Sequence, residues 1–248
     1  MIDPLYCRGF FIFTAMAFPF FYFTGATGDT NLILDEETSK HVIQVLRMKE
    51  GESLNLTDGK GLLLTTQITD GNRKRCGVVV RERVSVPVAE KKAVIAISLL
   101  KNSKRFEWFL EKATELGIYR IIPLLCQRTE KEKFREERLQ QILVSAMLQS
   151  QQAWLPLMGE PVPYAQIFED PMVKNIPDKF IAHCEDTERK SLKDAAMQGD
   201  KIILIGPEGD FSHEEIDLAL RHNFKPVILG PTRLRTETAG LYAAVIMK

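Results

Sequence analysis

From residue 93 onward, short apolar runs alternate with segments in which apolar residues recur every three or four positions. Runs of the first kind are typical of buried strands, and the second spacing is typical of amphipathic helices. The apolar runs lie at 93–100, 118–126, 179–184, 201–206 and 225–230, each followed by a plausible helix. Five strand–helix repeats predict an α/β fold with a parallel sheet that helices cover on both faces.

Two of the helices are marked by a regular apolar face. The segment 103–117 carries Phe106, Phe109, Leu110, Ala113 and Leu116 on one face and ends at Gly117. The segment 135–150 carries Leu139, Ile142, Leu143 and Ala146 at the same spacing. After the strand at 201–206, Ser212 and Glu215 have the spacing of a capping box, which predicts that a helix begins there.

Residues 20–88 have a different pattern, which predicts a small β-rich domain. Two strand-like runs at 52–69 flank Asp58-Gly59, a strong hairpin signal, and Asp70-Gly71 marks a second turn before a strand at 76–86. A short helix is expected within 35–48, and 85–92 reads as a linker. The predicted domains are therefore 16–88 and 89–248.

The first residues allow two interpretations. Residues 7–29 have one arginine, an apolar run over 10–23 and then small residues that include Ala26, roughly the layout of a signal peptide. That run is too short for a transmembrane helix. In the alternative, Met16 is the natural start, residues 1–15 are a dispensable extension, and the aromatic run 18–23 is the first strand. We expect the second arrangement.

Composition narrows the class of protein only slightly. The 248 residues are 45% hydrophobic and 27% charged, as in ordinary globular proteins, and 33 basic residues balance 33 acidic ones. Zero net charge predicts no polyanionic partner, although a basic patch can lie within a neutral total. The four cysteines are far apart and the histidines lack ligand spacing, so we expect no disulfide framework, no metal site and reduced cytoplasmic thiols.

The last two strand–helix turns are the best candidates for a site. The sequences "LIGPEG" at 204–209 and "ILGPTRLRTETAG" at 228–240 each follow a strand with Gly-Pro. Open α/β sheets bind ligands at the carboxyl ends of their strands, and glycine lets a ligand approach the backbone closely. Either turn alone can be purely structural. The Rossmann, P-loop and α/β-hydrolase motifs are absent from the chain.

Four motifs together resemble one family. "LIGPEGDFSHEEI" and "ILGPTRLRTETAGLYAA" look like the carboxyl-terminal signature of the SPOUT methyltransferases, and the "LRTETA" form resembles the ribosomal RNA small subunit methyltransferase E family. "KHVIQVLRMKEG" at 40–51 and "EKATELGI" at 111–118 are similar to two further motifs of that family. The resemblance covers about 20–248. It implies a PUA-like β-barrel followed by a SPOUT domain with a C-terminal trefoil knot, a homodimer, and S-adenosylmethionine-dependent N3-methylation of a uridine in 16S rRNA of the small ribosomal subunit.

The resemblance also assigns site residues. It implies that the cofactor rests on backbone groups of Gly206, Pro207, Glu208, Gly209, Leu229, Gly230, Leu234, Arg235, Thr236 and Thr238. Because uridine N3 carries a proton at neutral pH, a base is needed, and Glu237 is the candidate, with Arg235 holding the uracil anion or a phosphate. In the alternative, Glu237 caps the last helix and Arg235 pairs with it.

Three basic clusters are candidates for RNA binding, although a charge run is often only a solvated face. They comprise Arg47 and Lys49; Arg73, Lys74 and Arg75; and Lys101, Lys104 and Arg105. Together they could follow a phosphate backbone.

The chain departs from the family pattern at Leu148 and Gln152 in the mid-domain helix, which puts a substrate role of that helix end in doubt. It departs again at Gly209-Asp210, where the family has Gly-Gly. Two other functions stay open, a different SPOUT reaction such as ribose 2′-O-methylation, and a non-catalytic RNA-binding assembly factor.

Overall fold

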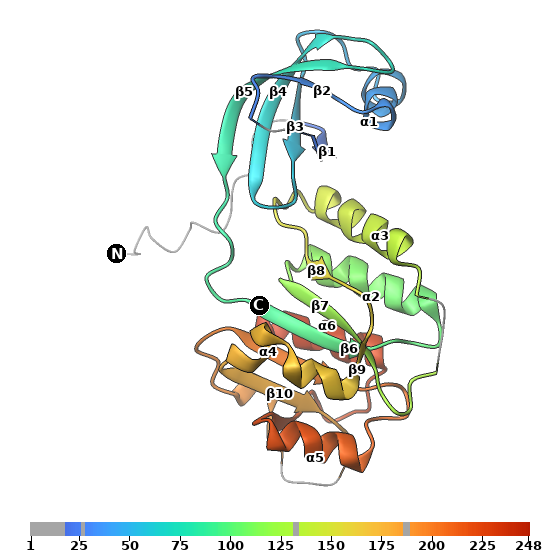
Figure 1. Ribbon diagram of the computed structural model, residues 1–248, viewed down its shortest axis with the longest axis vertical. Coiled ribbons are helices and arrows are strands. Elements are labelled where there is room, and N and C mark those ends of the chain that lie inside the picture. Colours follow the sequence, from blue (N-terminus) through green and yellow to red (C-terminus); the bar gives the residue numbers. More distant parts are fainter. Residues whose placement is uncertain (1–17, 26–27, 131–133, 186–188) are drawn as a thin grey trace. The chain divides into compact units, whose positions relative to one another are not determined.

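The structure is a computed structural model that describes residues 18–25, 28–130, 134–185 and 189–248 (Figure 1). The chain divides into two compact units, and each is described by itself. The first runs up to Ser85 except for Gly59–Gly61, which belong with Val86–Lys248 in the second. The expectations about residues 1–15, a start at Met16 and a cleavage point near Ala26 concern residues outside the described part.

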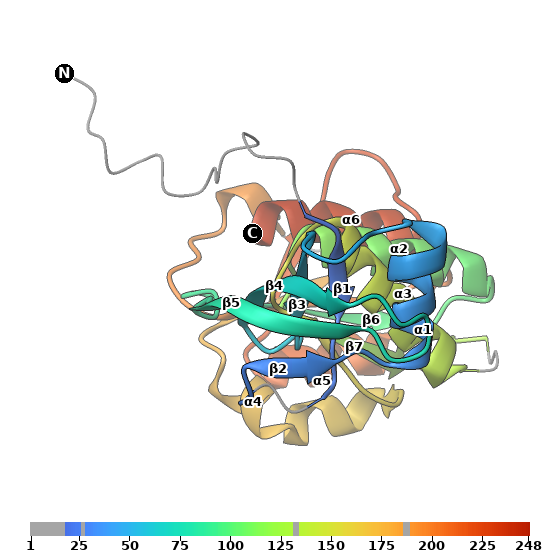
Figure 2. The same ribbon diagram turned by 90° about the horizontal axis from the view of Figure 1, so that it is seen from above.

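The first unit is a five-stranded mixed sheet with one short helical segment. Its strands are β1 (Phe20–Tyr22), β2 (Asn31–Ile33), β3 (Ser53–Thr57), β4 (Leu62–Asp70) and β5 (Gly77–Ser85). The order is β1-β3-β4-β5-β2, with β1 parallel to β3 and the other neighbours antiparallel. Figure 2 shows β5 between β4 and β2. Between β2 and β3 lie α1 (Glu36–Lys40) and the π-helix His41–Val45.

Period-two burial explains the hairpin that the sequence predicts. Leu54 and Leu56 of β3 are buried, as are Leu64 and Ile68 of β4, so one face of the pair covers the core of this unit. The turn at Asp58-Gly59 is confirmed, since Gly59 adopts the left-handed φ of 67°. The aromatic first strand is confirmed as β1. Strand β2 was not predicted, because only Leu32 of its three residues is buried and no alternation develops.

The second unit holds a parallel sheet. Its strands are β6 (Ala93–Ser98), β7 (Arg120–Leu125), β8 (Leu157–Met158), β9 (Val162–Pro163), β10 (Asp178–Ala182), β11 (Lys190–Ser191), β12 (Lys201–Ile205) and β13 (Lys225–Ile228). The order is β11-β13-β10-β12-β6-β7-β8, and β9 also pairs with β7. All of these pairs are parallel. The five predicted strands are confirmed as β6, β7, β10, β12 and β13.

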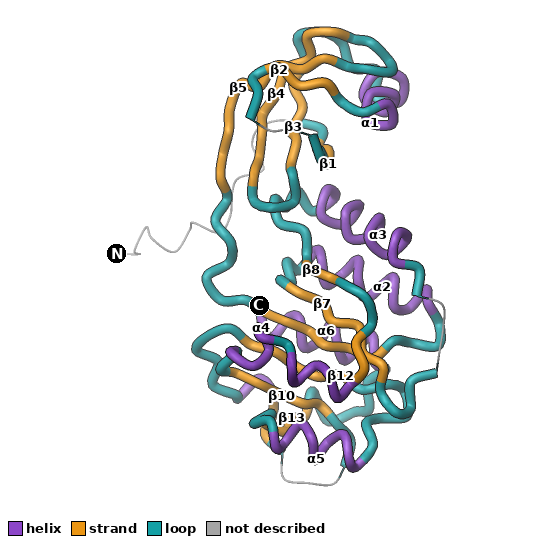
Figure 3. Tube along the Cα trace, in the orientation of Figure 1, coloured by secondary structure: helices purple, strands orange, loops and turns teal. Residues whose placement is uncertain are grey.

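Helices cover both faces of this sheet, as predicted (Figure 3). Along β6, Ile95 and Ile97 join one core and Val94 and Ala96 the other. The first core is closed by α2 (Ser103–Glu115), α3 (Glu136–Gln149) and α6 (Thr236–Met247). The second core is closed by the 3-10 helix Tyr164–Glu169, α4 (Pro171–Asn175) and α5 (His213–Arg221). None of the helices in the described residues is long and apolar enough to cross a membrane.

One predicted helix is wrong. The strand β10 is followed not by an α-helix but by the short β11 and the 3-10 helix Leu192–Asp194. Only Leu192 of that 3-10 helix is buried, so this stretch lacks the repeated apolar positions that hold an amphipathic helix against a sheet.

Candidate functional site

A cleft of the second unit lies where β10, β12 and β13 end. Its volume is about 500 Å³, within the usual range for small-molecule sites. In the parallel register, Ala182 of β10 pairs with Ile205 of β12 and with Val227 of β13, so the three strands end at the same level. Lining residues come from the segments that leave these strands, 182–184 with Arg189, 205–210, and 227–236, and from Ala239 in α6.

The cleft brings together most of the residues assigned to the cofactor. Those that line it are Gly206, Pro207, Glu208, Leu229, Gly230, Leu234, Arg235 and Thr236. Gly209 and Thr238 lie outside the lining. A Cβ at Gly209 would approach Arg128 within 3.4 Å, and Thr238 is exposed on the first turn of α6. The two Gly-Pro turns, Gly206-Pro207 and Gly230-Pro231, are 24 positions apart in the sequence and form neighbouring walls of one cleft.

The two turn glycines have different surroundings. A Cβ at Gly206 would lie 3.1 Å from Cδ2 of Phe211 and 3.2 Å from its backbone nitrogen, tighter than ordinary contact. A Cβ at Gly230 would meet nothing within 4 Å, although Gly230 lines the cleft. Neither glycine has a positive φ. Packing against Phe211 therefore accounts for Gly206, while the space at Gly230 is free for a ligand.

Asp210 occupies a strained position in the loop after β12. Its φ is 65°, in the left-handed region that favours glycine. The carboxylate offsets this cost by accepting hydrogen bonds from the backbone nitrogens of Cys184, at 2.7 Å, and Phe211, at 2.8 Å. The left-handed φ at this position explains why the family pattern has glycine there. In this chain the aspartate also ties the segment after β10 to the loop after β12.

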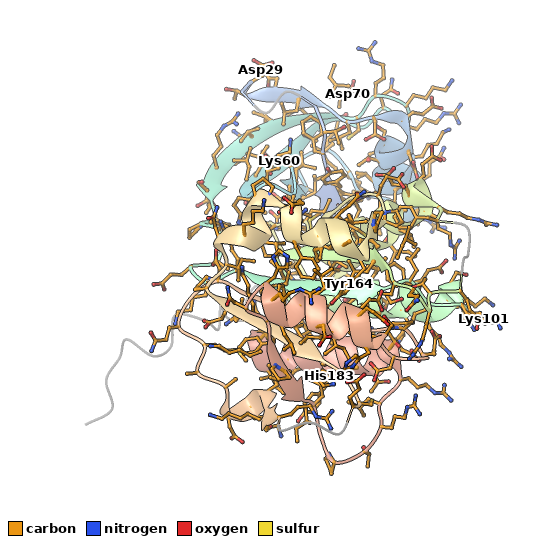
Figure 4. The ribbon with its side chains drawn as sticks, turned by 60° about the horizontal axis from the view of Figure 1, so that its bottom comes forward. Asp29, Lys60, Asp70, Lys101, Tyr164 and His183 are labelled. Carbon is orange, nitrogen blue, oxygen red and sulfur yellow. The ribbon has the colours of Figure 1, made fainter. Side chains whose placement is uncertain are left out.

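A second set of contacts fixes the same loop from the side of β7. Arg128 donates to the carbonyls of Gly209, at 2.8 Å, and Phe211, at 3.2 Å. The predicted capping box is confirmed at Ser212 and Glu215. Glu215 also accepts from the backbone nitrogen of Gln127 at 2.8 Å. The Tyr164 hydroxyl, labelled in Figure 4, donates to the Glu215 carbonyl at 2.8 Å. The floor of the cleft is therefore rigidly supported.

The first turn of α6 carries the two predicted catalytic residues. Arg235 is the N-cap residue, is exposed and lines the cleft. Glu237 is only 6% exposed. Its Oε1 lies 3.7 Å from Nε of Arg105, and its Oε2 has no hydrogen-bond partner within the described part of the chain. The predicted alternative, in which Arg235 pairs with Glu237, is not what the structure shows, because Arg105 of α2 takes that position.

Several lining residues were not predicted from the sequence, among them the polar or ionisable His183, Cys184, Arg189 and Asp210. The histidine is buried, and Arg189 donates from its guanidinium to the His183 carbonyl. Burial is the main reason that the pKa of His183 is lowered. The position of His183, near the carboxyl end of the predicted strand 179–184 and directly after the observed end of β10, was the signal that could have identified it.

The predicted RNA-binding residues fall in both units. Arg47, Lys49, Arg73, Lys74 and Arg75 are exposed on the first unit, with Arg47 at a φ of 56°. On the second unit, Lys101 pairs with Glu130 at 2.7 Å and Arg105 faces Glu237.

Gln152, a departure from the family pattern, has a structural role. Its side-chain amide donates to the carbonyls of Thr114, at 2.8 Å, and Glu115, at 2.9 Å, and so caps the end of α2. Among the described residues no cluster of three or more His, Cys, Asp or Glu is arranged to hold a metal ion.

Comparison with known proteins decides the family. A model described as an RNA methyltransferase domain matches residues 88–248, and one described as an RNA methyltransferase PUA domain matches residues 34–81. The ribosomal RNA small subunit methyltransferase E of a Synechocystis species is 31% identical over 80% of this chain and 67% of its own. This chain belongs to the ribosomal RNA small subunit methyltransferase E family.

Solved structures agree with this family across both units. A Porphyromonas gingivalis protein described as an rRNA methyltransferase has a TM-score of 0.84 and 36% identity, over 92% of this chain and 95% of its own. A methyltransferase E from Neisseria gonorrhoeae, solved with bound S-adenosyl methionine, has a TM-score of 0.82 and 26% identity, over 93% and 96%. This methyltransferase E chain thus combines a PUA domain with an α/β methyltransferase domain, acts on RNA and uses S-adenosylmethionine.

Proposed function

We propose that this methyltransferase transfers the methyl group of S-adenosylmethionine to N3 of a specific uridine in the 16S rRNA of the small ribosomal subunit. The relatives that share its architecture are named for the small-subunit rRNA. The main support for this reaction is the buried carboxylate of Glu237. One of its oxygens has no hydrogen-bond partner among the described residues, and Glu237 comes two positions after the cleft residue Arg235.

The residues of the cleft fit the cofactor. The cleft has the volume of a small-molecule site, the space at Gly230 is free on its cleft side, and the backbone from Leu229 to Leu234 belongs to no helix or strand that would use up its amides and carbonyls. Free backbone groups are suited to hydrogen bonds with adenine and with the amino acid end of the cofactor. The eight predicted residues that line the cleft would hold it, and Gly209 and Thr238 would contribute at most from outside the lining.

The chain's own part in the reaction is to position the base and to take a proton. The bound cofactor supplies a methyl group on a positively charged sulfur, which is displaced in line as the N3–carbon bond forms and the carbon–sulfur bond breaks. Glu237 accepts the N3 proton, since its Oε2 has no competing donor in the described structure. Arg235 stabilises the negative charge that develops on uracil.

RNA recognition is assigned to the first domain, residues 16–88, and catalysis to residues 89–248. The exposed basic residues Arg47, Lys49, Arg73, Lys74 and Arg75 supply phosphate contacts on the first domain. On the second domain, Lys101, Lys104 and Arg105 lie at the start of α2, and Arg105 faces Glu237. This assigns Arg105 two roles, to orient the base and to meet the RNA.

Further features of the proposal follow from the family. They are a SPOUT topology in which the segments 206–212 and 229–236 form a trefoil knot, a homodimer, and a cytoplasmic location where small subunits are assembled. Support for the dimer comes from α6, whose outward residues include Val245, 59% exposed, beside the half-buried Leu241 and Tyr242. A helix that is apolar on this face as well as on its core face is suited to a partner subunit.

The test is methylation of small subunits purified from cells that lack this protein, with nucleosides identified by mass spectrometry. We expect one N3-methyluridine per subunit with the wild-type enzyme. Glu237→Gln keeps the shape of the side chain but accepts no proton, so the rate should fall by about 100-fold or more while cofactor affinity is unchanged. The deficit should shrink at higher pH, because uridine then ionises without help.

A matched control is Glu160→Gln, since Glu160 is exposed and lies outside the cleft. This variant should methylate at the wild-type rate. Methylation of a ribose hydroxyl would contradict the proposed reaction, and no methylation despite cofactor binding would indicate an assembly factor. An unchanged rate for Glu237→Gln would remove Glu237 from the role of base.

A further inference from the structure

His183 follows the middle one of the three strands whose ends form the cleft. In the sheet, β10 runs between β12 and β13, and its last residue, Ala182, pairs with Ile205 on one side and Val227 on the other. His183 is the next residue, so it is level with Gly206 and Ile228 where the two Gly-Pro turns begin. Both turns and His183 line the same cleft.

The backbone on either side of the His183 ring is held in place. The guanidinium of Arg189 donates to the His183 carbonyl, and the next backbone nitrogen, of Cys184, donates to Asp210 at 2.7 Å. Both contacts tie this short segment to residues that also line the cleft. The backbone that carries the ring is therefore held in a defined position, which favours a role in binding.

The ring itself is not satisfied by the protein. His183 is only 6% exposed, yet neither Nδ1 nor Nε2 has a hydrogen-bond partner anywhere in the described residues. A neutral imidazole carries one donor and one acceptor, and burial without partners costs free energy for each. Leucine or phenylalanine would fill the same space without this cost. The histidine is explained if a ligand in the cleft supplies the missing partner.

We infer that His183 contacts the bound S-adenosylmethionine and forms a hydrogen bond with it through a neutral ring. The inference deepens the function proposed above, and it rests only on the cofactor and not on the identity of the methylated atom. Burial, with the nearby positive charge of Arg189, lowers the pKa of His183, against a smaller opposing effect of Asp210 and Glu185. A neutral ring also avoids placing a second positive charge near the sulfonium.

The experiment is calorimetric titration of the full-length protein with S-adenosylmethionine, beside a thermal melt of each sample. His183→Phe removes both nitrogens and keeps a planar ring, so affinity should fall about tenfold, the loss of one hydrogen bond, with an unchanged or higher melting temperature. His183→Asn places a polar atom near Nδ1, and His183→Gln places one near Nε2. One of the two should recover part of the affinity and show which nitrogen is used.

The pH dependence gives an independent measurement. Wild-type affinity should fall as the solution becomes more acidic than the lowered pKa of His183, and the Asn and Gln variants should lack that decrease. Titration with methylthioadenosine, which lacks the amino acid end, identifies the half of the cofactor that the ring contacts. If His183→Phe binds methylthioadenosine more weakly than the wild type does, the ring contacts the nucleoside half. If the two proteins bind it equally well, the ring contacts the amino acid half.

The matched control is His222→Phe. His222 stacks on Phe168 with ring centroids 4.4 Å apart and does not line the cleft, so this variant should bind the cofactor like the wild type. A folded His183→Phe protein with wild-type affinity would overturn the inference, as would an equal loss in His222→Phe. If His183→Phe fails to fold, the Asn and Gln variants decide instead. The inference would be overturned if both of them bound the cofactor with the affinity and the pH dependence of the wild type. A wild-type enzyme that binds the cofactor but methylates another atom would contradict only the proposed reaction.

Discussion

At the scale of single residues, the site contains two kinds of residue: those that fix the shape of the loops, and those that are free to contact a ligand. Phe211 crowds Gly206, and the carboxylate of Asp210 holds its own backbone in the left-handed region. Gly230 and His183 in the lining share the opposite property, as does Glu237, which lies next to the lining residue Thr236 but does not itself line the cleft; each has space or a polar atom that nothing in the described residues uses. Residues of this second kind should affect binding and rate more than stability.

Gly230→Val tests this distinction directly. The φ of Gly230 is not positive and a Cβ meets no neighbour, so the variant should fold with a melting temperature close to that of the wild type. Its branched side chain would project into the cleft and weaken S-adenosylmethionine binding by about 2 kcal/mol or more, the cost of a steric clash with a displaced hydrogen bond. Calorimetric titration beside a thermal melt measures both quantities.

The control for this prediction is Gly159→Val, because a Cβ at Gly159 also meets nothing within 4 Å but Gly159 is not among the cleft residues. It should bind the cofactor like the wild type. A folded Gly230→Val protein with full affinity would show that the cofactor does not pass this glycine.

His183 also makes stability depend on pH. Its pKa is lowered in the folded protein, chiefly by burial, so on acidification the unfolded chain binds a proton at this residue before the folded chain does. The contribution of His183 to the free energy of unfolding therefore falls as pH drops below the ordinary histidine value, and the loss stops below the folded pKa. His183→Phe should lose less stability than the wild type between about pH 8 and pH 5.

Denaturant unfolding at several pH values measures this difference. His213 acts in the opposite direction, since its hydrogen bond to the Glu185 carboxylate and the charge of Asp217 raise its pKa. The comparison must therefore be between His183→Phe and the wild type at each pH, rather than within one protein. Parallel pH profiles for the two proteins would contradict the prediction.

At the scale of elements, the sequence predicted what depends on local pattern. The strands β6 and β12 could be predicted because they are nearly continuous runs of apolar residues, and all of these residues are buried. Helix α2 could be predicted because Phe106, Phe109 and Leu110 repeat on one face. The capping box of α5 fixed its start. The short strands β8, β9 and β11 were invisible, since two-residue strands depend on their neighbours and carry no period of their own.

The same limit applies to the site. The Gly-Pro turns could be found because glycine and proline mark turns within the sequence itself. His183, Arg189 and the Arg105–Glu237 contact could not, because each depends on which strands and helices become neighbours in space. Burial of both ring nitrogens of His183 is a property of the fold and has no counterpart in the sequence "IAHCED".

The last helix carries a prediction about assembly. Ala243, Ala244 and Met247 of α6 are buried in the core, while Val245 is 59% exposed between the half-buried Tyr242 and Ile246. If this outward face is covered in a dimer, Val245→Glu places an unpaired charge in the interface and should shift the protein to monomer. Light scattering at micromolar concentration would report the mass.

The control for the assembly prediction is Val84→Glu, since Val84 is likewise exposed, at 41%, but lies on β5 of the first unit. That variant should keep the wild-type mass. A wild-type protein that is monomeric under these conditions would contradict the proposed dimer, and a dimeric Val245→Glu protein would place the interface elsewhere.

At the scale of the whole molecule, the zero net charge conceals an uneven distribution. Arg73, Lys74 and Arg75 are three consecutive exposed basic residues in the turn between β4 and β5. Replacement of all three by Gln should weaken RNA binding and reduce the slope of log affinity against log salt by about 2. Filter binding or fluorescence titration with small-subunit rRNA across a range of salt concentrations measures this slope.

A charge-matched control uses Lys174, Arg221 and Lys225, which are exposed on the second unit away from the cleft lining. Their replacement by Gln changes net charge equally and should leave the slope near its wild-type value. Equal slopes for all three proteins would show that the 73–75 cluster is only a solvated surface.

The contrast between Gly206 and Gly230 also determines how this sequence can vary through evolution. In a library of variants sorted by cellular abundance, substitutions at Gly206 should be depleted, because Phe211 crowds that position in the folded chain itself. Substitutions at Gly230 should survive that sorting and disappear only when cells are selected for methylated ribosomes. A descendant that had lost the reaction would therefore change first at Gly230, while Gly206 persisted as a remnant of the fold.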